Sequence, residues 1–436
     1  MKVLLIGNGA REHIIAERIA QDAELYSIMS AKNPAIAALS KKSWVCDICD
    51  PKKVAECAMD EGIDLAFASP DAVLAAGISD ALEKAGMLVA SPSKNAARIE
   101  WDKGFMRNLI KEQRVSGAID YEIAKSEEEA LRTMEKYENF VIKPLGLTGG
   151  KGVKVSGEHV KSTEEALAYV REILKNDSTA LIERKIEGEE FSLQAFSDGK
   201  RISIMPPVQD HKRAFTDELG PNTGGMGSYS TGKLLPFMEQ RDLADGEKIL
   251  RETIYAMKKA GVPFKGVLYG QFMATAEGVR IIEFNSRFGD PEAMNVLSLF
   301  KGSLTNILLS IADGNLDNAE FEEKASVVKY LVPNGYPDKP VHDAEVRVNA
   351  DALSKTGANA YYASVYENAG KVFTTKSRAF GIVGVADNIE EAEKIAEDAC
   401  GFVKGPLYHR EDIGTADLIS KRIEHMKKIR ASGDRP

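Results

Sequence analysis

Cysteine is scarce in this chain, with four among 436 residues, so no disulfide framework supports the fold. Cys46 and Cys49 form a C-x-x-C spacing, for which a redox or metal role is the alternative to buried structural thiols. No second such pair and no histidine lies nearby in the sequence, which favours structural thiols. So few cysteines are typical of a reducing compartment, and we expect a cytoplasmic protein.

Apolar runs of 18 residues are missing as well, which excludes a membrane-spanning helix. Residues 1–6 run directly into a glycine turn, as a buried strand does, and lack the long apolar region of a signal peptide. Basic charge is not in excess either, since the net charge is -9. We therefore expect no nucleic-acid and no membrane partner, because both need a broad basic face.

The length and the order of apolar runs predict about three domains. Up to residue 100, strands alternate with helices, as in a doubly wound parallel sheet. Antiparallel strands and helices follow to about residue 325, and an α+β unit begins at 326. The expected strands are 3–6, 65–68, 88–90, 140–144, 153–155, 180–183, 190–196, 267–274, 279–285, 327–332, 361–365 and 381–385. The expected helices are 11–20, 72–85, 163–175, 292–299, 304–313 and 389–403, with basic residues 425–430 on a solvated helix face.

Two segments carry the clearest chemical signal. Residues 220–227 read GPNTGGMG, a turn-rich loop with too few side chains to form a core. About 55 residues later, Glu283 and Asn285 stand two apart in an apolar run. A strand turns alternate side chains to the same face, so their oxygen atoms share one face. Such a pair suits a hard cation such as magnesium carrying nucleotide phosphates.

Two further glycine-rich turns are candidate anion sites. Residues 7–13 follow a strand and open a helix. This turn is either a plain connection or an anion site that Arg11 supplements. A nicotinamide site is the least favoured alternative, because position 12 is glutamate where the dinucleotide motif needs glycine. Residues 145–152 lack the P-loop spacing but suit a flexible cover over a triphosphate. Lys143, just before this loop, faces a buried anion or is a surface lysine.

Several charged residues have structural as well as functional interpretations. Glu183 and Glu190 flank a turn, where glutamates are usually solvated. The run 210–213 contains His211, a possible general base, although basic residues beside a glycine loop favour anion binding. Asp290 begins a helix, so it caps that helix or positions a substrate ammonium.

Taken in order, these segments resemble the phosphoribosylamine–glycine ligase family of the ATP-grasp superfamily. The resemblance covers nearly the whole chain and rests on residues 7–13, 143–153, 209–213, 220–227, 283–292 and 410–414. It implies an α/β and α+β multidomain fold. The implied units are an amino-terminal domain of doubly wound parallel sheet (1–100), an ATP-grasp core (101–325) with a small lid (120–187), and a carboxyl-terminal α+β domain (326–436).

The resemblance also implies roles for individual residues. ATP would be bound by Lys103, Lys143, Gly149, Gly150, Lys151, Gly152, Glu183 and Glu190, and Mg²⁺ or Mn²⁺ by Glu283 and Asn285. Glycine and 5-phosphoribosylamine would be bound by Gly9, Arg11, Asp210, Lys212, Arg213, Asn222, Thr223, Gly224, Gly225 and Arg287, with Gly9 and Arg11 at the sugar phosphate. The catalytic set would be Arg287, Lys143 and Asp290.

The chain departs from the family pattern at several positions. Trp101 stands where the family commonly has glycine, and Pro144 begins a segment that differs from the usual Ala-Asp-Gly. Glu218 replaces an aspartate, while Ser69 and Asp71 replace a glycine and a glutamate. These departures bear on nucleotide packing and pentose recognition.

The implied activity is ATP-dependent ligation of glycine to 5-phosphoribosylamine, through glycyl phosphate, in purine biosynthesis. Positioning and charge neutralisation would supply most of the acceleration. The alternatives are an ATP-grasp ligase for another carboxylate and amine, and a non-catalytic nucleotide-binding homologue. The partners would be small molecules, and the enzyme a monomer or weak homodimer.

Overall fold

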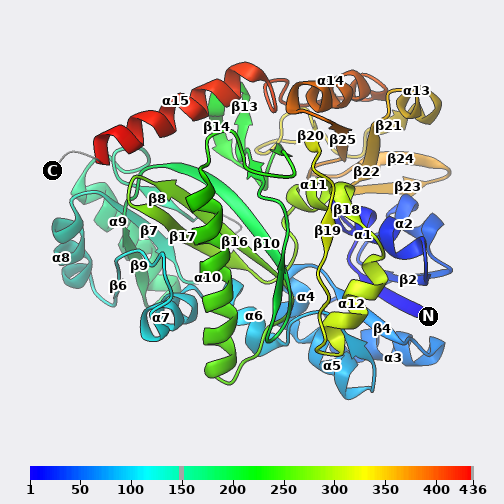
Figure 1. The fold of residues 1–436 in the computed structure, drawn as a ribbon, viewed down its shortest axis with the longest axis horizontal. Helices are drawn as coiled ribbons and strands as arrows, with labels where there is room; N and C mark the ends of the chain where they lie inside the picture. Colours follow the sequence, from blue (N-terminus) through cyan, green and yellow to red (C-terminus); the bar gives the residue numbers. More distant parts are fainter. Residues whose placement is uncertain (147–151, 434–436) are drawn as a thin grey trace.

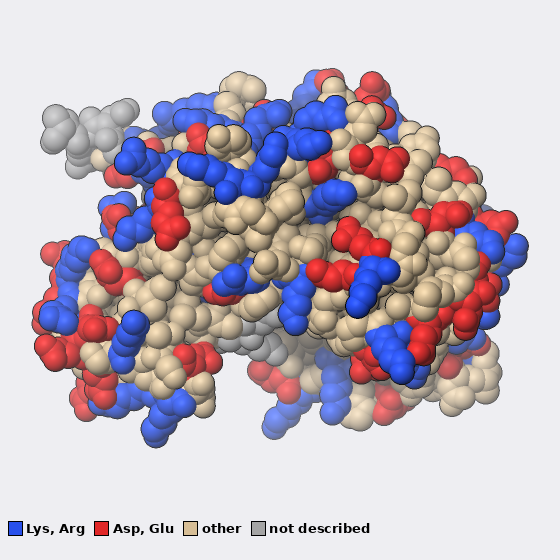
Figure 2. Space-filling model, turned by 90° about the horizontal axis from the view of Figure 1, so that it is seen from below, with Lys and Arg blue, Asp and Glu red and all other residues tan. Residues whose placement is uncertain are grey.

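The computed structural model describes residues 1–146 and 152–433. Figure 1 shows the amino-terminal sheet at one end of the molecule, beside the carboxyl-terminal strands, and the unit formed by residues 121–184 at the other end. A sheet of long antiparallel strands lies between them. Within the described ranges, no helix is long and apolar enough to cross a membrane. On the face shown in Figure 2, basic and acidic side chains intermingle rather than covering it with one sign.

The first sheet has five parallel strands in the order β3-β2-β1-β4-β5, which confirms the predicted doubly wound arrangement. Val3 and Leu5 of its central strand pack into one apolar cluster, whereas Leu4 and Ile6 pack into another. Both faces are therefore buried, as the continuous apolar run requires. The strands are β1 (Lys2–Ile6), β2 (Glu24–Met29), β3 (Lys42–Val45), β4 (Leu65–Ala68) and β5 (Leu88–Val89). The helices are α1 (Ala10–Ala20), α2 (Pro34–Leu39), α3 (Pro51–Glu61), α4 (Asp71–Ala76), α5 (Ile78–Lys84) and α6 (Lys94–Trp101).

The prediction of one helix over residues 72–85 is wrong. The chain forms α4 and α5, and Gly77 between them has φ +87°, in the left-handed region. Glycine adopts that conformation without a side-chain clash, so it ends one helix and begins the next.

The small unit is a four-stranded antiparallel sheet in the order β6-β9-β7-β8, covered by two helices. Val141 pairs with Val155, which confirms the predicted hairpin around the glycine-rich loop. This unit has its own apolar core. Its elements are β6 (Tyr121–Ala124), α8 (Glu127–Tyr137), β7 (Phe140–Pro144), β8 (Lys154–Val155), α9 (Thr163–Asp177) and β9 (Ala180–Arg184).

The central sheet has the order β11-β10-β16-β17 and is antiparallel throughout. Its strands contain the segments predicted at residues 190–196, 267–274 and 279–285. The elements of this region are α7 (Lys103–Gln113), β10 (Glu189–Asp198), β11 (Ile202–Ile204), α10 (Gln240–Lys259), β16 (Lys265–Thr275), β17 (Gly278–Asn285), α11 (Glu292–Leu299), β18 (Phe300–Lys301), α12 (Leu304–Ala312) and β19 (Glu320–Phe321).

A third large sheet joins the middle of the chain to its end, because β15 pairs with β20 across the predicted boundary at 325–326. That boundary stays a prediction. The elements from the middle are β12 (Gln209–Asp210), β13 (Arg213–Phe215), β14 (Leu219–Asn222) and β15 (Gly227–Ser230). The later strands are β20 (Ala325–Pro333), β21 (Glu345–Val348), β22 (Asn359–Tyr362), β23 (Val365–Asn368), β24 (Lys371–Thr374), β25 (Phe380–Ala386), β26 (Val403–Lys404) and β27 (Leu407–Tyr408). The later helices are α13 (Ala350–Ser354), α14 (Ile389–Cys400) and α15 (Ala416–Gly433).

The last helix, α15, crosses the top of the molecule in Figure 1 toward the small unit. His425 lies 2.6 Å from Glu189, and Arg430 pairs with Asp242 at 2.5 Å. The predicted solvated face is confirmed for His425, whose side chain is 49% exposed, and is wrong for Arg430, which is 18% exposed. Both side chains nevertheless pair with residues of the central region. They hold the end of the chain against the central region.

His13 joins the amino-terminal sheet to the carboxyl-terminal strands. Its Nδ1 accepts a hydrogen bond of 2.9 Å from the Tyr362 amide, and its ring meets Tyr361 and Tyr362 edge-on. Burial lowers the pKa of His13 to about 4. The Asn33 side chain reinforces the contact by donating to the Tyr362 carbonyl at 2.9 Å.

We expect His13 to make the protein sensitive to mild acid. Because its folded pKa of about 4 lies below the ordinary 6.5, the unfolded chain takes up the proton first. The stability is present above pH 6.5 and falls as the pH drops toward 4, by up to about 3 kcal/mol. Urea unfolding of wild type and of His13→Asn at pH 7.5 and 5 measures this loss, and an equal loss in both would contradict the account.

Candidate active site

Lys143 and Glu183 form a buried ion pair inside the small unit of residues 121–184, which falls within the predicted lid (120–187) and is called the lid below. Nζ of Lys143, on β7, lies 2.6 Å from Oε2 of Glu183, on β9, the adjacent strand. Glu183 is 2% exposed and Lys143 7%. The alternatives of a surface lysine and a solvated glutamate are therefore wrong. Burial would raise the pKa of Glu183, but the charges of Arg107 and Lys143 hold it at about 2.

Arg107 was missed by the sequence analysis and lies on the other side of Glu183. Its Nε is 2.5 Å from Oε1 of Glu183. Its Nη1 and Nη2 donate to the carbonyls of Ile281 and Ile282, at 3.1 and 2.9 Å. One fully buried guanidinium thus connects α7, the lid strand β9 and the strand β17 directly before Glu283.

Glu283 and Asn285 lie where the period of the strand predicts, opposite Gln271 and Tyr269 of β16. Both are partly exposed, and among the described residues no hydrogen bond or ion pair engages the Glu283 carboxylate. Within the same part of the chain, no three His, Cys, Asp or Glu side chains form a metal-binding group. The oxygen atoms of Glu283 and Asn285 are of the kind that magnesium prefers, and the metal site stays a prediction.

Arg287 follows the metal-binding candidates and is held by Glu100, a second residue that the sequence analysis missed. The Arg287 Nη2 lies 3.0 Å from Glu100 Oε1 and 3.4 Å from Asn285 Oδ1. Ser286 donates its amide and hydroxyl to Glu100 Oε2, at 2.9 and 2.7 Å. Burial opposes the charge of Arg287, but Glu100 and Asp71 raise its pKa above the ordinary value.

Lys103 lies at the entrance of the glycine-rich loop. Its Nζ donates to the Gly146 carbonyl at 2.7 Å, and burial lowers its pKa. Gly152 accepts a hydrogen bond from the Tyr169 hydroxyl at 2.9 Å. The remaining predicted loop residues, Gly149, Gly150 and Lys151, lie outside the described residues.

A second charged group lies along β10 and β12. Lys212 Nζ is 3.1 Å from Glu190 Oε2, which also accepts from Gln271 at 2.9 Å. Burial opposes ionisation of Glu190, but the charge of Lys212 lowers its pKa. Burial raises the pKa of Asp210 to about 7, against the charge of Lys212 and with the help of Glu292. The charges of Asp210 and Lys212 act on each other, and their role in binding substrate stays a prediction.

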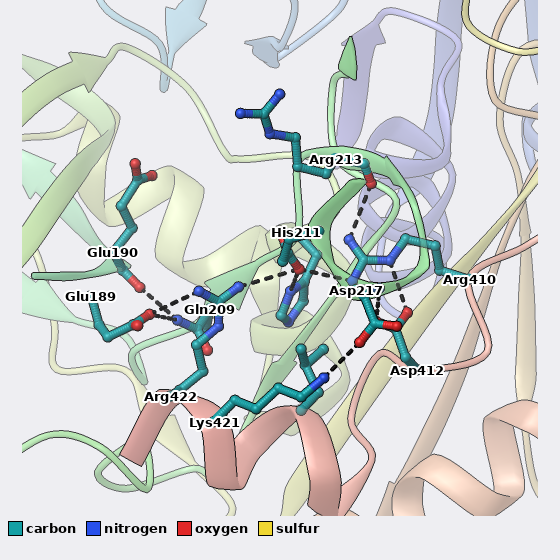
Figure 3. A network of polar contacts seen from close by, with 12 residues as sticks. Glu189, Glu190, Gln209, His211, Arg213, Asp217, Arg410, Asp412, Lys421 and Arg422 are labelled. Atoms are coloured by element: carbon teal, nitrogen blue, oxygen red, sulfur yellow. Dashed lines mark hydrogen bonds and ion pairs between the residues drawn. The ribbon is translucent and has the colours of Figure 1, made fainter. Parts of the chain in front are cut away.

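His211, between them in sequence, is buried, and its Nδ1 lies 2.9 Å from Glu218 Oε1. Glu218 also accepts from Arg410 at 2.8 Å and lies 3.2 Å from Arg422. Figure 3 shows this network joining the middle of the chain to α15. Burial lowers the pKa of His211, although Glu218 opposes the shift. The burial of this ring and its contact with Glu218 favour the structural interpretation of His211 over a general base.

The loop 220–227 packs beside this network. Thr223 donates its amide and hydroxyl to the Lys212 carbonyl, at 2.7 and 2.8 Å. Asn222 is the strand partner of Arg213, whose Nη1 donates to the Gly220 carbonyl at 2.9 Å. The predicted acceptor residues are therefore neighbours, with Gly224 and Gly225 next in the loop.

The glycine turn at Gly9 differs from an open anion site. The Glu12 carboxylate accepts from the Gly9 amide at 2.6 Å and pairs with Arg11 at 2.6 Å. Ser69, one of the departures from the family pattern, donates to the same carboxylate at 2.6 Å. Arg11 also donates to the Phe288 carbonyl at 3.0 Å. The protein's own carboxylate thus occupies this turn, which does not support a sugar-phosphate site there.

Comparison with known proteins shows the family to which the chain belongs. The family models for phosphoribosylglycinamide synthetase match residues 1–100 (N domain), 101–293 (ATP-grasp domain) and 326–416 (C domain). The chain belongs to the phosphoribosylglycinamide synthetase family. The predicted family resemblance and fold class are confirmed.

Two curated relatives and two solved structures illustrate the similarity. The phosphoribosylamine–glycine ligases of Methanobrevibacter smithii and Methanosarcina barkeri are 47% and 48% identical over 98% and 99% of this chain and their full lengths. The phosphoribosylamine–glycine ligase structure from Thermotoga maritima has a TM-score of 0.81 and 25% identity, covering 95% of this chain and 100% of that one. The biotin carboxylase domain of Hydrogenobacter thermophilus 2-oxoglutarate carboxylase, solved with MgADP, shares the fold at a TM-score of 0.73 and 15% identity, over 100% and 99% of the two chains.

We expect Glu183→Gln to destabilise the protein by about 3 kcal/mol, because two buried cations lose their common counter-charge. It should also raise the KM for ATP, because Lys143 loses the partner that holds it. Thermal unfolding and initial rates measure the two effects. Glu187→Gln, at an exposed position in the turn after β9, is the matched control. Equal behaviour of the two variants would contradict the role of Glu183.

Proposed function

We propose that this protein joins glycine to 5-phosphoribosylamine, with cleavage of ATP to ADP and phosphate, to give glycinamide ribonucleotide. The observation that supports the proposal, in a chain of this family, is that Glu190 links two groups of residues: it pairs with Lys212 and accepts from Gln271, the strand partner of Glu283. Lys143, fixed by Glu183, belongs to the first group, with the Glu283–Asn285 pair. The second is the acceptor loop, residues 220–227, with Lys212 beside it.

In the first step, a glycine carboxylate oxygen attacks the γ-phosphorus of ATP, and the bond to the β-phosphate oxygen breaks to release ADP. Lys143 and Lys103 would neutralise charge on the transferred phosphoryl group. Glu283 and Asn285 would hold Mg²⁺ or Mn²⁺, which supplies Lewis-acid stabilisation of the phosphate oxygens. Glu183 would keep Lys143 oriented throughout the step.

In the second step, the amine nitrogen of phosphoribosylamine attacks the acyl carbon of glycyl phosphate, phosphate leaves, and the nitrogen loses a proton. Arg287, fixed by Glu100, would stabilise the departing phosphate. Asp210 is a candidate acceptor for the proton, because its pKa of about 7 keeps part of it ionised near neutrality. Lys212, Arg213 and the acceptor loop would position the substrates.

Water would hydrolyse glycyl phosphate, so the site has to exclude water during the reaction. The lid strands β7 and β8 flank the glycine-rich loop on the side of Lys143. All four cysteines are free, as is usual in a reducing compartment, and we infer a cytoplasmic location. We expect the enzyme to be a monomer or a weak homodimer.

The direct test of the function is ADP release with phosphoribosylamine generated in place. We expect ADP only when ATP, glycine and phosphoribosylamine are all present, with glycinamide ribonucleotide formed in equal amount. Release with a different carboxylate or amine, and none with this pair, would refute the assignment.

We expect Glu283→Gln and Asn285→Ala each to lower turnover by about 10²-fold or more, because positioned charge at the phosphates is lost. Both variants should unfold at the wild-type temperature, since Glu283 and Asn285 are partly exposed. Glu277→Gln, in the exposed turn of the same hairpin, is the control. Wild-type turnover of both variants at saturating magnesium would rule out this metal site.

A further inference from the structure

Arg378 lies in the connection between the carboxyl-terminal strands β24 and β25 and contacts the acceptor loop. Its Nη1 donates to the carbonyls of Gly224 and Gly225, at 2.7 and 3.0 Å. The same nitrogen lies 3.0 Å from the Asp290 carbonyl, and Nη2 lies 3.0 Å from Asp290 Oδ2. The Arg378 side chain is only 15% exposed. One guanidinium therefore joins three parts of the chain that are far apart in sequence.

These contacts fix the orientation of the loop peptides. In a trans peptide the carbonyl and the next amide point in opposite directions. With the Gly224 carbonyl on Arg378, the Gly225 amide turns to the Thr223 hydroxyl at 3.1 Å. With the Gly225 carbonyl on Arg378, the Met226 amide turns to the His211 carbonyl at 2.7 Å. The arginine thus holds one side of the loop, and the segment of His211 and Lys212 holds the other.

The path of the loop requires glycine at position 225 and leaves little room for a side chain at position 224. A Cβ on Gly225, which has φ +109°, would lie 2.6 Å from Pro291 Cδ. A Cβ on Gly224 would lie 3.3 Å from Arg378 Cζ. The approach of Arg378 and the turn at Pro291 therefore explain in part why glycine stands at positions 224 and 225 of the motif.

Arg378 also fixes Asp290, the predicted catalytic carboxylate. Its Oδ2 accepts from Arg378, and its Oδ1 accepts from the Tyr330 hydroxyl. The guanidinium lies over the Tyr330 ring, 4.3 Å from its centroid. Both oxygens of Asp290 have protein partners, so its orientation is set by residues of the carboxyl-terminal sheet.

We propose that Arg378 is the positioning residue through which the carboxyl-terminal strands complete the acceptor pocket. The inference rests on the proposed function, because it assigns the loop 220–227 to the acceptor. The phosphate-binding candidates Lys143 and Glu283 have no contact with Arg378 among the described residues. Loss of Arg378 should therefore impair use of glycine and phosphoribosylamine while leaving ATP binding unchanged.

The experiment compares Arg378→Ala and Arg378→Lys with Arg347→Ala, whose arginine is exposed on the same unit. We expect Arg378→Ala to lower kcat/KM for phosphoribosylamine by about 10²-fold, because small displacements of a positioned substrate cost that much. The KM for ATP should stay within about twofold, and more than one ADP should be released for each product molecule. Arg378→Lys should recover part of the lost kcat/KM, since lysine keeps the positive charge but not the planar set of N–H donors of the guanidinium.

A merely structural role predicts a different pattern. If Arg378 only stabilised the fold, Arg378→Ala would lower the rates with all three substrates equally and would still release one ADP per product. This outcome would overturn the inference. So would wild-type kinetics in Arg378→Ala. If Arg378→Ala does not fold, Arg378→Lys alone decides between the two patterns. Wild-type enzyme without glycine-dependent ADP release would instead refute the proposed function, which keeps the two failures distinct.

Discussion

The buried carboxylate of Glu183 between two cations is the interaction on which the rest of the site depends. Lys143 on one side faces the predicted phosphates, and Arg107 on the other reaches the strand that carries Glu283. A carboxylate removed from water is costly unless it is paired, and here both oxygens are engaged. Glu183 and Arg107 therefore connect the lid to the central sheet. This connection fixes Lys143 relative to the Glu283–Asn285 pair.

The carboxyl-terminal part of the chain fixes the other half of the site in the same way. Arg378 holds the acceptor loop, while Arg410 and Arg422 hold Glu218 beside His211. Glu218, where the family usually has aspartate, reaches all three of His211, Arg410 and Arg422 with its longer side chain. The departure at Trp101 has no such explanation in this structure.

Periodic patterns in the sequence predicted much of the fold and one part of the candidate site. Alternating strands and helices predicted the parallel sheet, and the two-residue period of a strand placed Glu283 and Asn285 on one face. The sequence was insufficient where a partner came from a distant segment. Arg107 and Glu100 sit on helices whose charged residues look solvated, and their partners lie 76 and 187 residues away. The hydrogen bond from the Gly9 amide to the Glu12 carboxylate is local but was not predicted either. A carboxylate that binds its own glycine turn has the same sequence pattern as an open anion site.

The most direct measurement is a crystal structure of the protein with magnesium and an ATP analogue. We expect the metal ion on Glu283 and Asn285, and the Lys143 ammonium between the Glu183 carboxylate and the phosphates. A metal ion bound elsewhere, or a Lys143 that leaves Glu183 and points away from the phosphates, would contradict the account.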